Sequence, residues 1–244
     1  MKTAISWSAG KDSSLALYKA IKNGYEISYL LNFISKKYKR CCFHGIPMKL
    51  VRLQANLIDI PLFQKAVSPD MKLYEKEFKE AVNFFKEKGI KAMVFGDIYL
   101  IDHKKWVERV CKDLKIKQVE PLWKRNPEKI VEEFIGLGFK AVVVSAKAGL
   151  FDKSFIGREV DKQFLAELKK RKICPCGENG EFHTLVIDGP IFKKGRIKIT
   201  KSRPVLKKGF WPHWFLDIQR WKTVKKLKVE NKLIKKYGKI KKYS

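Results

Sequence analysis

The sequence has few acidic residues, few cysteines and no long apolar run. Asp and Glu number 25 against 54 Lys and Arg, which gives a formal net charge of +29. This excess favours polyanionic partners such as nucleotides, RNA or an acidic protein face. The five cysteines are odd in number and unevenly spaced, which argues against a disulfide framework or a zinc ribbon and favours a reducing, cytoplasmic location. No apolar run approaches the roughly 18 residues of a membrane span, so we expect no membrane partner.

The loop near the N-terminus lacks a glycine that a Walker A loop would need. Thr3–Trp7 forms an apolar run typical of a buried strand, and Ser14–Ile21 begins a helical pattern. Between them lie Gly10 and Lys11, without the earlier glycine and without the Ser or Thr that follows the Walker Lys. A strand, a small-residue loop and a helix N-terminus still bind anions, because the first helical amides and the helix dipole point into the loop. We therefore predict a phosphate-binding loop of another type.

The loop carries groups that suit ATP and Mg²⁺. The predicted phosphate-binding residues are consecutive: Ser8, Ala9, Gly10, Lys11, Asp12 and Ser13. Lys11 supplies a positive charge, and Asp12 can hold a Mg²⁺ ion that bridges phosphates. The stretch resembles the SGGKDS pyrophosphate loop of the N-type ATP pyrophosphatases, which cleave ATP between the α and β phosphates. Ala9 replaces the first glycine of that motif, its second residue, and it would be strained if the position required a positive φ. The alternative is an ordinary helix cap by Asp12 or Ser13.

Apolar strands and amphipathic helices alternate through the first half of the chain. Strands are expected at Ile27–Phe33, from Ile60 onward and at Ala92–Phe95, and helices at about Met48–Leu57, Tyr74–Lys88 and His103–Leu114. Repeated βα units indicate an α/β fold, with a parallel sheet and helices on both faces. Ligands of such sheets lie beyond the carboxyl ends of the strands. Ser8–Ser13, the loop of His44 and Gly96-Asp97 each follow a strand, so we expect them to converge.

The chain restarts at Asn126-Pro127, where Asn is typical of an N-cap and Pro of a first helical turn. We place a nucleotide-binding domain at 1–125, a smaller α/β substrate domain at 126–218 and a basic tail at 219–244. Further elements are expected at Ala141–Val144, Val160–Lys170, Thr184–Ile187 and Arg196–Thr200. The tail has Arg220 and ten Lys against the single Glu230, a net charge of +10. Either a basic amphipathic helix or a solvated tail fits this composition.

A second polar signature spans Cys176–Thr184. It places two carboxylates, an amide, an imidazole and two glycines within nine residues. The glycines permit a sharply folded backbone, so that the polar side chains can converge on one small ligand. A surface turn is the alternative interpretation.

Together, the two signatures resemble the diphthine–ammonia ligase family. The motifs that match in order and approximate spacing are Ser8–Ser13, Phe43-His44, Gly96-Asp97-Ile98, Pro121-Leu122-Trp123, Gly157-Arg158 and Cys176–Thr184. The resemblance runs from about residue 3 to about 192. It implies a Rossmann-like (HUP) nucleotide-binding domain and a second, smaller α/β domain. It also implies the amidation by ammonia of diphthine, a modified histidine on translation elongation factor 2, with ATP converted to AMP and pyrophosphate through an acyl-adenylate.

That chemistry fits the residues present. Attack of a carboxylate on the α-phosphorus creates a mixed anhydride that ammonia can open, and the departing pyrophosphate needs stabilisation. The predicted catalytic residues are Lys11, Asp12, Glu178 and His183, and the ATP site also includes His44, Gly96 and Asp97. The residues predicted to bind the substrate, including its quaternary ammonium, are Trp123, Gly177, Glu178, Asn179, Glu181 and His183. His183 would orient the carboxylate or take an ammonium proton, and the sequence leaves both roles open.

A second reaction, which ranks behind the amide ligase, is also compatible with the first loop. A tRNA-modifying ATP pyrophosphatase would adenylate a base oxygen for replacement by sulfur or an amine. A nucleotide-binding regulator without catalysis is a third reading. RNA contact through the basic tail and formation of a homodimer both stay open.

Overall fold

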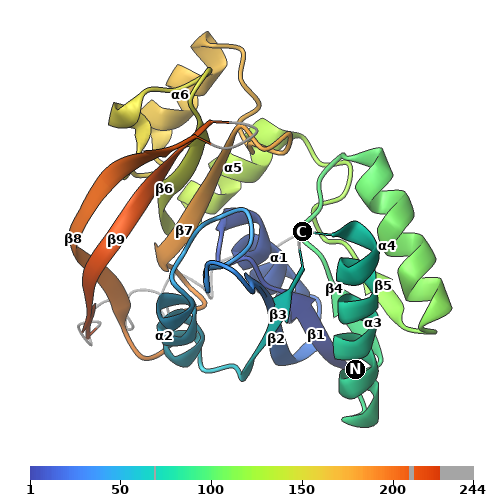
Figure 1. The fold of residues 1–244 in the computed structure, drawn as a ribbon. Coiled ribbons are helices and arrows are strands. Elements are labelled where there is room, and N and C mark those ends of the chain that lie inside the picture. The colour runs from blue at the N-terminus through green and yellow to red at the C-terminus, as the bar shows by residue number, and fades with distance from the viewer. Residues whose placement is uncertain (69, 209–211, 226–244) are drawn as a thin grey trace, which may run out of the picture.

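The computed structural model describes residues 1–68, 70–208 and 212–225, and over these residues the chain forms two sheets with helices around them (Figure 1). The first sheet is parallel throughout, in the order β3-β2-β1-β4-β5. Its strands are β1 (Lys2–Ser6), β2 (Glu26–Ser35), β3 (Leu62–Val67), β4 (Ala92–Val94) and β5 (Lys117–Val119). The strand order reverses at β1, which lies between β2 and β4, and a ligand crevice is expected at such a point.

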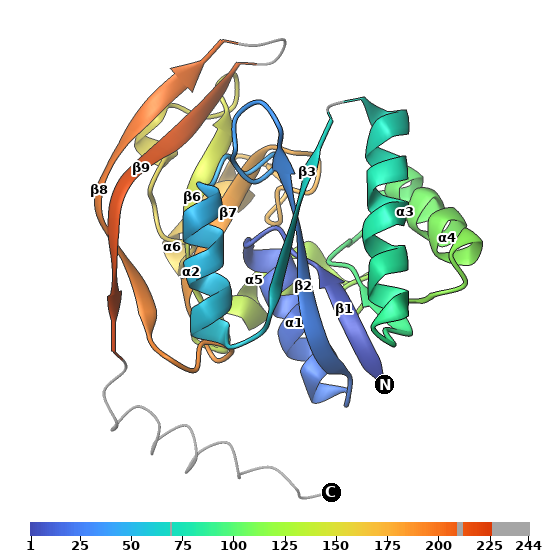
Figure 2. The same ribbon diagram turned by 60° about the horizontal axis from the view of Figure 1, so that its bottom comes forward.

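Helices cover both faces of this sheet, as the alternating pattern predicted. They are α1 (Lys11–Lys22), α2 (Met48–Ile58), α3 (Met71–Glu87) and α4 (Ile101–Asp113). Figure 2 shows α3 and α4 on one side and α1 and α2 on the other, toward the second sheet. Alternate residues of β1 therefore enter different cores, Ala4 packing with α3 and α4 and Ile5 with α1 and α2. The predicted Rossmann-like α/β class is confirmed.

The second half forms an antiparallel sheet in the order β7-β6-β9-β8. Its elements are α5 (Pro127–Gly136), β6 (Lys140–Lys147), the short 3-10 helix Lys153–Phe155, α6 (Lys162–Lys170), β7 (Phe182–Asp188), β8 (Arg196–Lys207) and β9 (His213–Val224). The N-cap of α5 is Asn126, whose side chain accepts a hydrogen bond from Lys129 N at 3.1 Å. The domain boundary near residue 125 stays a prediction, because the two sheets share one apolar core.

Two helices begin a few residues away from the start that the sequence pattern predicts, because an acidic N-cap residue fixes the start of each. Asp70 accepts hydrogen bonds from the amides of Lys72 and Leu73, so α3 begins three residues before Tyr74. Asp161 accepts one from Phe164 N at 2.7 Å, so α6 begins at Lys162 and leaves Val160 outside. A capping carboxylate satisfies orphan amides of the first turn and thereby fixes the start of the helix.

The β8–β9 hairpin is the main departure from the expected elements. Only Arg196–Thr200 had a β-like pattern, and the basic tail was expected to start at 219, but β9 continues through Val224. In β9, Leu216 and Ile218 are buried on either side of Asp217, but the consecutive apolar residues before Leu216 and the basic residues after Ile218 obscure this two-residue period. Residues 226–244, where most of the predicted tail lies, are outside the described residues. No helix of the described part is long and apolar enough to cross a membrane.

Candidate active site

The predicted phosphate-binding loop and the second signature lie against each other at the carboxyl end of β1. Lys11 N donates to Thr184 Oγ1 at 3.0 Å, across 173 positions of sequence. His44 Nδ1 donates to Thr184 O at 2.8 Å, and Val186 N donates to Ala9 O at 3.0 Å. Segments that are far apart in the sequence therefore form the walls of one crevice.

Lys11 connects the two walls through its side chain. The side chain is buried, with Lys11 only 3 % exposed, and its ammonium donates to Asp12 Oδ2 at 2.8 Å and to the carbonyl oxygen of Cys176. Burial alone would lower the pKa of Lys11, but the Asp12 carboxylate raises it above its ordinary value. The group therefore stays positively charged at the junction, where the predicted pyrophosphate would need it.

Asp12 has an oxygen suited to a metal ion. Its Oδ1 is buried and has no hydrogen-bond partner among the described residues. Mg²⁺ is commonly held by one or two carboxylates together with substrate phosphates. Within residues 1–68, 70–208 and 212–225, no three metal-ligating side chains gather into a site of their own. The unpaired oxygen thus fits a Mg²⁺ ion that is bound jointly by Asp12 and ATP.

The loop backbone is tightly enclosed. Gly96 packs directly on it, since a Cβ at Gly96 would lie 3.1 Å from both Asp12 C and Ser13 N. Ala9 is fully buried and adopts a φ of 68°. The residue that departs from the pyrophosphate-loop motif therefore occupies a conformation that favours glycine.

Replacing Ala9 with Gly is expected to stabilise the fold by about 1 kcal/mol, because the left-handed conformation costs an L-residue roughly 1–2 kcal/mol and glycine offsets part of this through its greater unfolded-state entropy. Urea unfolding of the two proteins measures the difference. As a control, the same change at Ala20, a buried residue within α1, should destabilise the fold. A destabilised Ala9→Gly variant would contradict the strain inferred at this position.

The second signature folds into a turn that is attached to the loop after β4. Glu178 Oε1 accepts a hydrogen bond from Ile98 N at 3.0 Å. Tyr99 Oη donates to Cys174 Sγ and accepts from Asn179 Nδ2, both at 3.1 Å. These contacts place Glu178 beside the phosphate-binding loop and fix the turn around it.

Two predicted substrate-binding residues make contacts within this turn. Glu181 is buried and accepts hydrogen bonds from Asn179 N at 2.9 Å and from Asn179 Nδ2 at 3.0 Å. Gly177, with a φ of 64°, packs against Phe182, whose carbonyl oxygen would lie 2.7 Å from an added Cβ. We assign Glu181 and Asn179 to shaping the turn, which leaves Glu178 as the carboxylate available to a ligand.

Three carboxylates influence one another in the crevice. Burial, followed by the charges of Asp12 and Asp97, raises the pKa of Glu178 to about 7. Asp97 contacts His103 Nδ1, and this contact raises the pKa of that imidazole. His103 was missed in the sequence, where the only signal is its place in the first turn of the helix that follows Gly96-Asp97. The crevice is thus suited to a cation.

His44 and His183 form the other side, with ring centroids 4.7 Å apart. Burial lowers the pKa of His44 to about 4 and lowers the pKa of His183 well below its ordinary value. A carbonyl can only accept, so His44 carries its proton on Nδ1. Both imidazoles are neutral at physiological pH.

The ring of Trp123 is less available to a substrate cation than the sequence suggests. The Lys104 ammonium lies 5.3 Å from the centroid of its ring and pairs with Glu120. A cation of the protein itself therefore already lies over one face of this ring, and recognition of a substrate cation by Trp123 stays a prediction.

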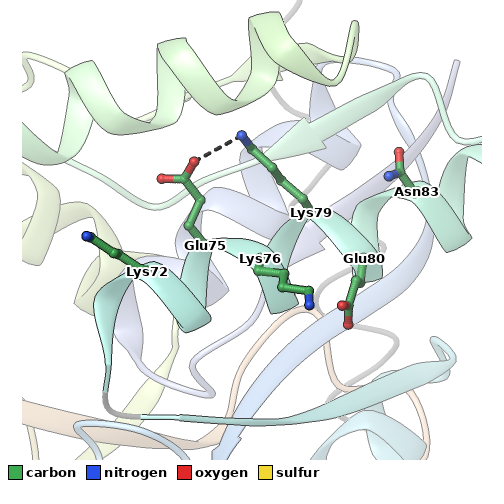
Figure 3. Close-up of a pocket in the computed structure, with 6 residues that line it drawn as sticks. All are labelled: Lys72, Glu75, Lys76, Lys79, Glu80 and Asn83. Carbon is green, nitrogen blue, oxygen red and sulfur yellow. Dashed lines mark ion pairs between the residues drawn. The ribbon is translucent and has the colours of Figure 1, made fainter.

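A pocket on α3 lies apart from this crevice (Figure 3). Its lining consists of Lys72, Glu75, Lys76, Lys79, Glu80 and Asn83. Glu75 and Lys79 pair at 3.0 Å along the helix. None of the predicted site residues lines this pocket.

Comparison with known proteins gives the family. The diphthamide synthase N-terminal domain matches residues 1–118, and the diphthamide synthase C-terminal domain matches residues 126–224. Proteins named diphthine–ammonia ligase are similar: the mouse protein is 27% identical over 90% of this chain and 91% of its own length, and the human protein 28% over 84% and 85%. The Schizosaccharomyces pombe protein is 28% identical over 81% of this chain, which spans only 36% of that longer relative.

A solved structure titled as a predicted subunit of tRNA methyltransferase from Methanocaldococcus jannaschii has a TM-score of 0.44 and 16% identity, over 78% of this chain and 97% of its own. That likeness is too low for an inference about function. The two domain matches, in contrast, follow one another along nearly the whole chain, and both come from one family. The chain belongs to the diphthamide synthase family.

Proposed function

We propose that this protein is an ATP-dependent ligase that converts diphthine on translation elongation factor 2 to diphthamide with ammonia, releasing AMP and pyrophosphate. The observation that supports this most is the position of the Lys11 ammonium between Asp12 and the Cys176 carbonyl, because it joins the two signatures in one crevice. A single nucleotide can then be contacted from both walls.

The first half-reaction activates the substrate carboxylate. One of its oxygens attacks the α-phosphorus, the bond from the α-phosphorus to the bridging oxygen breaks, and pyrophosphate leaves. Lys11 and the first amides of α1 stabilise the negative charge on the leaving group. Asp12 would hold a Mg²⁺ ion, which would supply further charge neutralisation for the departing pyrophosphate.

The second half-reaction forms the amide. The nitrogen lone pair of ammonia attacks the acyl carbon, AMP leaves with the bridging oxygen, and a proton passes from nitrogen to a base. His183 is neutral and therefore able to accept this proton. Glu178, with Asp97 nearby, binds the quaternary ammonium of diphthine and holds the carboxylate toward the α-phosphate.

The test is reconstitution with purified components. The protein is incubated with ATP, Mg²⁺, isotopically labelled ammonium and elongation factor 2 that carries diphthine, and AMP and label in the factor are measured. We expect equal amounts of AMP and incorporated nitrogen, and neither with a factor that lacks diphthine. AMP formed only when undermodified tRNA replaces the factor would contradict the proposal and favour base modification.

A further inference from the structure

A second cavity, of about 650 Å³, lies between the loop after β2 and the β8–β9 hairpin. Arg40 joins its two walls, donating through Nη1 to Gly45 O at 2.9 Å and through Nη2 to Asp217 Oδ1 at 3.2 Å. Gly45 lies on the ring of Phe215, where an added Cβ would be 2.8 Å from Cδ1. Figure 2 shows this loop beside β9.

The cavity adjoins the catalytic crevice through residues 41–45. Phe43 and Gly45 line the cavity, while His44 between them contacts Thr184 in the crevice. The Phe43 ring centroid is 6.5 Å from that of His183. A ligand in the cavity is therefore next to the proposed reacting groups.

The cavity carries an excess of positive charge. Its lining includes Arg40, Arg203, Lys207 and Lys208 against one carboxylate, Asp217. That carboxylate is paired with Arg40 at 3.2 Å and with Arg203 at 3.5 Å. Lys207 and Lys208 are exposed and form no ion pair within the part of the chain that the structure describes. This charge complements an acidic partner.

Exposed aromatic side chains lie at the same place. Phe43 is 76 % exposed and Tyr38 66 %, more than any other large apolar residue of the described chain. Below them, Val205, Phe215 and Leu216 add apolar lining. Single exposed apolar residues are ordinary, but two aromatic rings over an apolar floor with basic neighbours are typical of a protein-binding surface.

We propose that this cavity docks the polypeptide of the protein substrate beside the modified histidine, through a segment that combines acidic and apolar side chains. The inference rests on the proposed function, because a folded factor that inserts one side chain into the crevice must place its backbone on an adjoining surface. An apolar floor favours a polypeptide over RNA, whose phosphates are bound by extended basic tracks.

The test compares two charge reversals of equal size. Lys207→Glu/Lys208→Glu alters the cavity, and Lys72→Glu/Lys76→Glu alters the exposed face of α3 shown in Figure 3. Binding of the diphthine-bearing factor is measured by titration at low salt, together with KM for the factor and for ATP. The cavity variant should bind the factor at least about tenfold more weakly, with ATP KM unchanged, and the α3 variant should behave like the wild type. Phe43→Ala, which removes an exposed ring, should weaken factor binding about tenfold at any salt concentration.

The outcomes separate the two proposals. If the wild type binds the factor but forms no AMP, the result contradicts the proposed function and still supports the docking surface. Equal factor binding by the wild type and the cavity variant would overturn the docking surface, even if turnover is normal. Absence of wild-type factor binding would overturn it as well. Single-stranded RNA is titrated in parallel, and a cavity variant that loses affinity for this RNA but not for the factor would also overturn it.

Discussion

Replacing Lys11 with Met is expected to lower the rate of AMP formation by about 10²–10³-fold, the usual loss when one preorganised group that stabilises developing charge is removed. Met keeps most of the buried volume but has no charge to stabilise departing pyrophosphate. The rate is measured in the reconstituted reaction with saturating ATP, factor and ammonium. Turnover within a few fold of the wild type would remove Lys11 from the catalytic residues.

The fold must be controlled in this experiment, because Lys11 also pairs with Asp12 in the crevice. Removing one partner of a fully buried ion pair costs about 3–5 kcal/mol of folding stability. The Asp12 side chain is 27 % exposed, so the stability lost by Lys11→Met should be smaller than this. The matched control is Lys11→Met/Asp12→Asn, which leaves no unpaired charge. We expect the double variant to recover most of the stability lost by Lys11→Met in urea unfolding and to stay inactive. Recovery of activity together with stability would mean that the single variant was inactive through unfolding.

Replacing Glu178 with Gln is expected to raise KM for the diphthine-bearing factor about 30-fold or more, corresponding to at least roughly 2 kcal/mol for a buried charge contact. KM for ATP should change little. For the wild type, kcat/KM for the factor should rise as the pH passes about 7, where Glu178 ionises. This rise of kcat/KM with pH should be absent in the Gln variant, since only an ionised carboxylate attracts the quaternary ammonium. A larger effect on ATP than on the factor would place Glu178 on the nucleotide side.

The same carboxylate gives an independent stability readout. Its pKa in the folded protein, about 7, lies above the ordinary value of 4.5, so the folded state holds a proton that the unfolded state has lost between these values. The contribution of Glu178 to the stability of the wild type should therefore fall as the pH rises from about 4.5 through 7. Glu178→Gln removes this dependence, and its thermal midpoint should exceed that of the wild type more at pH 8 than at pH 5. Parallel pH curves would contradict the raised pKa.

Most helices and strands around the parallel sheet could be predicted from the sequence, because their hydrophobic periods are strong and local. In α3, which the sequence predicts as an amphipathic helix, the face formed by Phe78, Ala81, Val82 and Phe85 is buried. Small loops that follow β1, β2 and β4 converge because parallel strands bring their carboxyl ends to one edge. That arrangement follows from topology alone, without knowledge of side-chain contacts.

Other features depended on contacts that no local pattern contains. Glu181 accepts hydrogen bonds from Asn179 whereas Glu178 accepts one from Ile98 N, and because no local pattern shows either contact, the two acids could not be told apart in the sequence. The role of His103 appears only when its ring meets Asp97. In β9, the run Trp214–Leu216 and the basic residues after Ile218 obscured the alternation by which Leu216 and Ile218 are buried.

A crystal structure with Mg²⁺ and an ATP analogue whose α–β bridging oxygen is replaced by methylene tests most directly whether one nucleotide is held from both walls. We expect its β- and γ-phosphates on the amides and side chains of Ser8–Ser13, its metal ion on Asp12 Oδ1, and its α-phosphate facing Glu178 and His183. A nucleotide bound to the N-terminal loop with the turn of residues 176–184 moved out of reach, or bound elsewhere on the chain, would contradict the shared site.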